Sequence, residues 1–189
     1  MGPVTRVEDF VSHFDALAGK IPANVYYQDL PDGNRISALV YPDVPEEGML
    51  VGITYGLSLL DNPAWTRGRP ELLIGVKSTD HRWARAAGLL AANIPDCPFS
   101  YGTVLNFGQP ITDESTMDHF VVFAPTLLDE ADFLNVLNAP EGAPAQDVIH
   151  VAGIYPIHAS EAAAISDGKL EEFWKSGADL YDVTRPAVL

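Results

Sequence analysis

Two long and predominantly apolar runs constrain the fold more than any other feature of this sequence, one from Met49 to Tyr55 and one from Val148 to Pro156. Runs of this length are typical of strands in the interior of a sheet, because a strand with one face in water would alternate apolar and polar residues. An interior strand needs neighbours on both sides and packing layers on both faces. We therefore expect a layered structure built around one sheet.

Shorter β-prone segments supply the neighbouring strands. Two of them flank the turn Pro31-Asp-Gly-Asn34, and an Asp-Gly turn between two such segments predicts a hairpin. The predicted strands, apart from the two long runs, cover Val25–Leu30, Ile36–Tyr41, Glu71–Lys77, Thr103–Phe107 and His119–Ala124.

Apolar residues recur at helical spacing in several other segments. The predicted helices cover Val7–Gly19, Trp83–Ala92, Ser160–Gly168 and Leu170–Ser176. Asp80 or Thr79 is expected to cap the second of these helices, because short polar side chains accept hydrogen bonds from the first free N–H groups. The segment Leu128–Leu137 fits either a short helix or irregular structure.

The order of these elements indicates the fold class. The strands come mostly in consecutive runs, with helices at the ends and between them, which predicts an α/β structure of the α+β type. We expect a mixed sheet flanked by helices rather than a doubly wound parallel sheet. The 189 residues suit one domain, residues 1–189, with an N-terminal helical segment over residues 1–22 and an extended C-terminal tail over residues 178–189.

Charge limits the partners of this chain. The sequence has 26 acidic and 11 basic residues, for a net charge of -15, which repels nucleic-acid phosphates and anionic lipid surfaces. No stretch approaches the ~20 apolar residues of a membrane span, and the N-terminus lacks the apolar centre of a signal peptide. Cys97 is the single cysteine, so no internal disulfide can form. We predict a cytoplasmic protein that binds neither nucleic acid nor membranes.

The sequence contains no motif for nucleotide binding or for a serine nucleophile, and we predict no cofactor and no metal. His158 and Glu161 are three residues apart at the start of a predicted helix. They fit a capping pair better than a metal site, which needs more ligands. Glu71 heads an apolar strand. It is expected either to face water at the strand end or to face inward and pair with Tyr55, Thr54 or an arginine.

Three stretches near the C-terminus carry further candidate residues, from Gly153 to Glu161, from Asp167 to Trp174 and from Asp179 to Pro186. Asp182 and Arg185 are expected to pair with each other or with the body of the protein. The candidate binding residues of the whole chain are Tyr55, Glu71, Tyr155, His158, Glu161, Asp182 and Arg185.

An ordered set of motifs resembles the suppressor-of-fused domain family. It comprises Thr54-Tyr-Gly-Leu-Ser58, Pro70-Glu-Leu-Leu-Ile74, Trp83 and the stretch from Gly153 to Pro186, and it extends from about residue 25 to the end of the chain. The resemblance implies a mixed sheet flanked by helices and no enzymatic activity. Animal members are adaptors that hold a transcription factor through a short peptide, between this domain and a second, C-terminal domain. The chain ends where the first domain would end, so we expect no two-domain cleft.

Three functional hypotheses follow. The first is a protein-binding domain, and the resemblance adds that stand-alone bacterial members include immunity proteins that neutralise toxins. A basic toxin would suit the acidic charge, because opposite charges speed association. The second is a small enzyme with a pocket near Tyr55, Glu71, His158 and Glu161. The third is a peptide binder that adds a strand to a sheet edge. The sequence does not set the oligomeric state.

Overall fold

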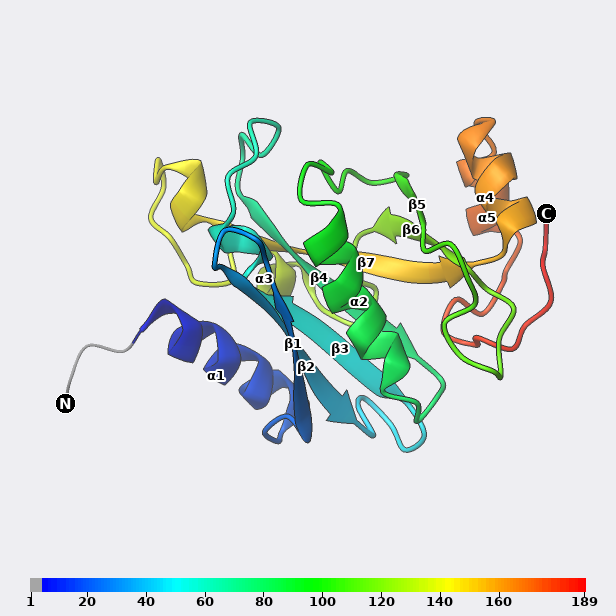
Figure 1. Cartoon of the computed structure of the whole chain (residues 1–189), viewed down its shortest axis with the longest axis horizontal. Helices are drawn as coiled ribbons and strands as arrows, with labels where there is room; N and C mark the ends of the chain where they lie inside the picture. Colours follow the sequence, from blue (N-terminus) through cyan, green and yellow to red (C-terminus); the bar gives the residue numbers. More distant parts are fainter. Residues whose placement is uncertain (1–4) are drawn as a thin grey trace.

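The computed structural model describes residues 5–189, and its centre is one seven-stranded sheet with the strand order β1-β2-β3-β4-β7-β6-β5 (Figure 1). Residues 1–4 of the predicted helical segment 1–22 lie outside the described residues. The strands are β1 (Asn24–Asp29), β2 (Arg35–Pro42), β3 (Leu50–Tyr55), β4 (Arg69–Val76), β5 (Val104–Asn106), β6 (His119–Phe123) and β7 (Ile149–Ile157). The helices are α1 (Arg6–Ala18), α2 (Arg82–Asn93), α3 (Glu130–Phe133), α4 (Ala159–Ser166) and α5 (Leu170–Lys175), with short 3-10 turns η1 (Leu57–Leu59) and η2 (Ala145–Asp147).

The sheet is mixed, which confirms the predicted fold class. Neighbouring strands run antiparallel except for β4 and β7, which pair in parallel from Arg69 opposite Ile149 to Leu73 opposite Gly153. The two long apolar runs became β3 and β7, both inside the sheet. Every residue of β3 is buried, and so is every residue of β7 except His150. Burial on both faces explains why these runs contain so few polar residues.

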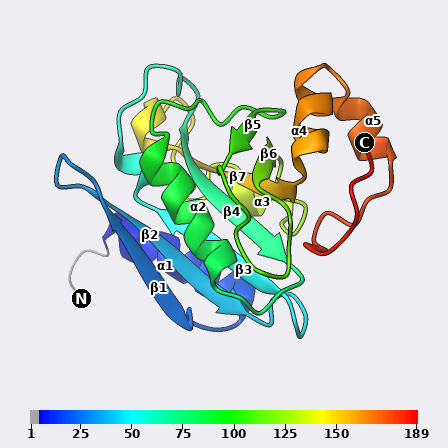
Figure 2. The same ribbon diagram turned by 45° about the vertical axis from the view of Figure 1, so that its right-hand side comes forward.

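Helices cover both faces of the sheet (Figure 2). One face packs against α2, whose Trp83 is fully buried. Gly52 lets α2 approach this face, because a Cβ atom at Gly52 would lie 2.5 Å from the Ala84 Cβ atom. The other face packs against α1 through Phe10 and Phe14, and against α3 through Phe133. The sheet is thus the middle layer of three.

A third apolar cluster lies beyond the end of β7, where α4 and α5 pack beside β6 (Figure 1, right side). Phe173 is buried in this cluster, and the Trp174 ring lies 4.5 Å from the Phe123 ring, measured between centroids. The C-terminal tail then runs back along the body of the protein, where the Lys77 N–H donates to the Tyr181 carbonyl oxygen at 2.7 Å. A salt bridge of 2.6 Å between Lys77 and Asp179 ties the same part of the tail.

Several predicted boundaries shift. β4 begins at Arg69 rather than Glu71, because Arg69 and Pro70 join the parallel ladder with β7. Only four residues of the segment 128–137 form a helix, α3, so the described chain has five α-helices rather than about four. The prediction that Asp80 or Thr79 caps α2 is wrong, because the N-cap residue is His81 and its side chain makes no capping hydrogen bond. The Asp80 carboxylate, one residue earlier, accepts the Arg82 N–H at 2.9 Å. The predicted hairpin is present as β1 and β2.

Candidate functional site

Two of the predicted site residues, Glu71 and Glu161, are completely buried carboxylic acids. Burying a carboxylate without partners is costly, so each of these groups must be satisfied by nearby donors. The two glutamates solve this problem differently. Glu71 is held by a threonine and two backbone N–H groups, whereas Glu161 is held by an arginine and two backbone N–H groups.

The Glu71 carboxylate fixes the turn that follows β3. Its Oε2 accepts the Thr54 hydroxyl at 2.6 Å, and its Oε1 accepts the N–H groups of Gly56 at 2.8 Å and Ser58 at 2.9 Å. Gly56 has a φ of 120°, and a Cβ atom there would lie 2.3 Å from the Arg35 carbonyl oxygen. Glycine is therefore required at this position. The prediction of an inward-facing, paired Glu71 holds for Thr54, whereas the alternative of a strand-end carboxylate in water is wrong.

Tyr55 and arginine do not hold Glu71. The Tyr55 ring packs 5.0 Å from the Phe10 ring between centroids, in the apolar layer under α1. Burial raises the pKa of Tyr55, and the Glu71 carboxylate raises it further while Arg6 lowers it. Burial also raises the pKa of Glu71, against the lowering effect of its hydrogen-bond donors. A buried acid among neutral donors favours its neutral form more than an exposed one does.

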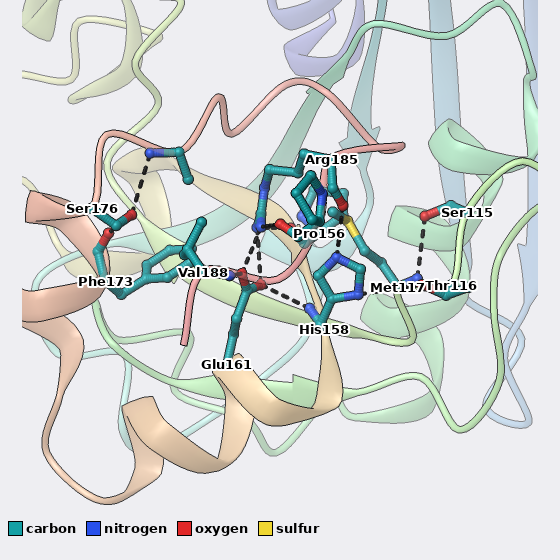
Figure 3. Close-up of polar contacts among 12 residues, drawn as sticks. Ser115, Thr116, Met117, Pro156, His158, Glu161, Phe173, Ser176, Arg185 and Val188 are labelled. Atoms are coloured by element: carbon teal, nitrogen blue, oxygen red, sulfur yellow. Dashed lines mark hydrogen bonds and ion pairs between the residues drawn. The ribbon is translucent and has the colours of Figure 1, made fainter.

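Glu161 lies at the start of α4 and forms a buried, two-point ion pair with Arg185 (Figure 3). The Arg185 Nη1 atom lies 2.6 Å from Oε1, and the Nη2 atom lies 2.9 Å from Oε2. The N–H groups of His158 at 2.9 Å and Val188 at 3.0 Å also donate hydrogen bonds to this carboxylate. Burial alone would raise the pKa of Glu161, but Arg185 and these N–H groups outweigh burial and lower it below its usual value. We call this arrangement the Glu161–Arg185 clasp.

His158 supports the clasp with both ring nitrogens. Nε2 lies 2.9 Å from the Arg185 carbonyl oxygen, and Nδ1 lies 3.3 Å from the Thr116 hydroxyl. The predicted capping pair is present, because His158 is the N-cap residue of α4 and forms a capping box with Glu161, whose side chain accepts the His158 N–H. The imidazole also contacts the tail. Among residues 5–189, no three His, Cys, Asp or Glu side chains gather as metal ligands would. His158 and Glu161 thus bind the C-terminal tail through Arg185.

Arg185 pairs with the body of the protein and not with Asp182. The Asp182 carboxylate instead accepts the N–H and the hydroxyl of Thr184, two residues later. The Arg185 side chain is only 5% exposed, so its ion pair with Glu161 is buried. Buried ion pairs cost far more to break than exposed ones.

Tyr155 anchors the segment after β6. Its hydroxyl donates to the Ala124 carbonyl oxygen at 2.7 Å and accepts the Thr126 N–H at 2.9 Å. The Thr126 hydroxyl also lies 2.5 Å from the Tyr181 hydroxyl of the tail. Burial raises the pKa of Tyr155, so its phenol stays protonated and able to donate.

The four residues proposed for a catalytic pocket lie in two groups, Tyr55 with Glu71 and His158 with Glu161. Glu71 lies opposite Val151 in the parallel ladder, whereas Glu161 follows the end of β7 at Ile157. Val151 and Ile157 are six residues apart in β7, which corresponds to ~20 Å of strand. Glu71 holds the turn after β3, whereas His158 and Glu161 hold the start of α4 and the tail, so these side chains form internal hydrogen bonds in two separate places.

The structure also contains a groove that left no signal in the sequence. It has a cavity of about 200 Å³ between α1, the sheet and the segment before α3. Apolar side chains line most of it, and Asp129 and Asp132 stand on one wall. The groove is lined by Phe14, Leu17, Ala18, Tyr41, Val44, Pro45, Val51, Leu73, Leu127, Leu128, Asp129 and Asp132. We call it the α1 groove.

A three-layer α+β domain with a mixed sheet, whose buried acids hold a turn and a tail, defines a structural class rather than a reaction. Comparison with known proteins gives the family. Residues 32–186 match the family described as suppressor of fused protein (SUFU), and the chain belongs to that family. This confirms the resemblance found in the sequence. No curated protein sequence matches the chain.

Solved structures share the fold at low sequence identity. A suppressor of fused homologue from Neisseria gonorrhoeae FA 1090 superimposes with a TM-score of 0.69 and 16% identity, over 96% of each chain. A chain of the Sufu–Fu complex gives a TM-score of 0.63 and 15% identity, over 99% of this chain and 93% of that one. Drosophila Suppressor of Fused gives a TM-score of 0.52 and 10% identity, over 82% of this chain and 42% of that one.

Proposed function

We propose that this chain is a non-enzymatic protein-binding domain. The observation that carries the proposal is its membership of the SUFU family over residues 32–186, together with its likeness to a chain of the Sufu–Fu complex. That relative has a protein partner. Because the likeness covers nearly the whole length of both chains, the same framework is available here to present a binding surface.

The hydrogen bonds of the polar candidate residues support binding over catalysis. Glu71, Glu161, His158 and Tyr155 all form internal hydrogen bonds that hold a turn, a helix start or the tail. A catalytic acid or base must instead present its proton to a bound substrate. No helix of the described chain is long and apolar enough to cross a membrane.

The charge of the chain suggests the kind of partner. A net charge of -15 favours encounter with a basic protein, and it disfavours nucleic acid. In the specific form of this proposal, the partner is a basic toxin, and the chain neutralises it in the cytoplasm. A short basic peptide within a larger protein would satisfy the same charge requirement.

Affinity capture tests the proposal. The full chain is immobilised and exposed to lysate of its source organism at low and at high salt, and bound proteins are identified by mass spectrometry. We expect a basic protein at near-equal stoichiometry at ~50 mM salt and much less at ~500 mM, because salt screens charge attraction. Recovery of no stoichiometric partner at either salt, or turnover of a small molecule by the pure chain, would contradict the proposal.

A second candidate is peptide binding by strand addition, which one observation favours. β1 is an end strand of the sheet, and its Tyr27 side chain is 55% exposed. End strands pair with added strands unless charge or proline blocks them. Tyr27→Lys would place such a charge on β1. Unchanged affinity of this variant for the captured partner would exclude β1 as the binding edge.

A further inference from the structure

The α1 groove has apolar walls and an acidic rim. Phe14 and Leu17 of α1 form one wall, and Leu127 and Leu128 form the other. Leu127 is seated against the sheet at Gly75, where a Cβ atom would lie 2.3 Å from the Leu127 Cδ1 atom. A glycine at this position of β4 therefore lets the segment before α3 close one side of the groove.

Two carboxylates on the groove lack a cation from the described chain. Asp129 and Asp132 line the cavity, and none of the salt bridges formed within residues 5–189 involves either of them. Asp15, on the same helix as Phe14, accepts the Tyr41 hydroxyl at 2.9 Å. Lys20 is the basic residue at this end of α1, and its ammonium donates to the Pro42 carbonyl oxygen at 2.9 Å. Asp129 and Asp132 line the cavity and Lys20 does not, so the rim of the groove carries negative charge.

The cavity has the size of one side chain. Pockets for whole small-molecule ligands occupy about 300–1,000 Å³, whereas this cavity measures about 200 Å³. Lysine and arginine bury their aliphatic stems along apolar surface and keep the charged end near water or a carboxylate. A long cationic side chain therefore matches both the apolar walls and the acidic rim, whereas a purely apolar residue would leave the carboxylates unused.

We propose that the α1 groove is the anchoring pocket of the partner-binding surface and takes an arginine or lysine side chain of a basic protein. This inference rests on the proposed protein-binding function and adds to it the place of binding and the chemistry of the residue recognised. The stem contacts Phe14 and Leu128, and the charged end lies between Asp129 and Asp132. A single anchor of this kind in a concave site carries a large share of binding energy in many interfaces.

The pocket can be tested without the partner. Butylguanidinium, which reproduces the arginine side chain, is titrated into the ¹⁵N-labelled full chain, with the uncharged isostere butylurea in a parallel titration. We expect butylguanidinium to shift the amide signals of Leu17, Leu128 and Asp132, and butylurea to bind at least threefold more weakly. Equal affinity of the two probes, or shifts spread over the whole surface, would overturn the proposal.

A charge-matched pair of variants separates the groove from the overall charge. Asp129→Asn with Asp132→Asn and the control Glu141→Gln with Asp147→Asn both change the net charge from -15 to -13, since each removes two acids. Glu141 and Asp147 are exposed and lie outside the groove. We expect the groove variant to bind butylguanidinium about three- to tenfold more weakly, as for two solvent-facing charge pairs, and the control to bind normally.

The captured partner supplies the last comparison, which distinguishes failure of the pocket from failure of the function. If the groove variant binds the partner as tightly as the unmodified chain does, the pocket is wrong while the binding function stands. If no partner is captured but butylguanidinium still selects the groove, the cation pocket stands and the binding function fails. Ala18→Phe, which fills the cavity from α1, should abolish the probe shifts. Thermal unfolding of each variant confirms that it is folded.

Discussion

Removing the arginine of the Glu161–Arg185 clasp should cost more stability than any surface change. Arg185→Met leaves the Glu161 carboxylate, which is 0% exposed, with only the backbone donors of His158 and Val188. Breaking a buried ion pair by removing one partner costs about 3–5 kcal/mol of unfolding free energy. For a chain of this length, that loss lowers the melting temperature by about 10 °C.

Urea unfolding followed by tryptophan fluorescence measures this loss, because Trp174 packs near Phe173 beside the clasp. Arg82→Met is a matched control, since Arg82 forms an exposed pair with Asp80 and should cost at most about 1 kcal/mol. The double variant Glu161→Gln with Arg185→Met should recover at least ~1 kcal/mol, because it leaves no unpaired buried charge. A loss below about 1 kcal/mol for Arg185→Met would refute the argument.

The clasp should also give stability a dependence on pH. The pKa of Glu161 is lower in the folded protein than in the unfolded chain. The clasp therefore contributes its full stability above the unfolded pKa, near 4.5, and loses it as the pH falls through the folded pKa. The difference in stability between the unmodified chain and Arg185→Met should shrink over this acid range. The raised pKa of Glu71 makes stability change with pH in the opposite direction. Both proteins contain Glu71, so its effect cancels when the stability of one is subtracted from that of the other.

Two smaller changes test other parts of the framework. Gly56→Ala should lower the free energy of unfolding by about 2–3 kcal/mol, because the added methyl group meets the Arg35 carbonyl oxygen at a positive φ. Gly33→Ala, at a positive φ in open space, should cost only about 1 kcal/mol, and equal losses would contradict the steric explanation. Tyr155→Phe should cost about 1–3 kcal/mol by leaving the Ala124 carbonyl and the Thr126 N–H without their partner, measured by the same urea unfolding. No loss in this variant would show that water replaces the phenol.

The sequence predicted best those features that depend on local pattern. The apolar runs of β3 and β7 could be recognised as interior strands because both faces of these strands are buried. The hairpin of β1 and β2 was equally clear from its Asp-Gly turn. Family membership followed from an ordered set of short motifs spread over most of the chain, and the match over residues 32–186 confirms it.

Partners of the buried acids were harder to predict. Glu161 and Arg185 were both singled out, but they are 24 residues apart, and the path of the tail decides whether they meet. Two donors to Glu71 are backbone N–H groups, which exist at nearly every residue and leave no sequence signature.

The α1 groove was missed for a related reason. Its lining comes from α1, three strands, the loop after β2, the segment before α3 and α3 itself, and these elements lie far apart in the sequence. Asp129 and Asp132 stood in a stretch that fitted either helix or irregular structure, so the pattern did not show where they point.

The association rate of the chain with its captured partner, measured as a function of salt, tests the protein-binding claim most directly. Charge-assisted association is fast at low salt and slows steeply as salt shortens the Debye length from ~10 Å at 0.1 M to ~3 Å at 1 M. For a domain of net charge -15 that binds a basic protein, we predict a fall of at least tenfold over this range, and a smaller fall for the Asp129→Asn with Asp132→Asn variant. A rate that does not change with salt, or no measurable association, would contradict the claim.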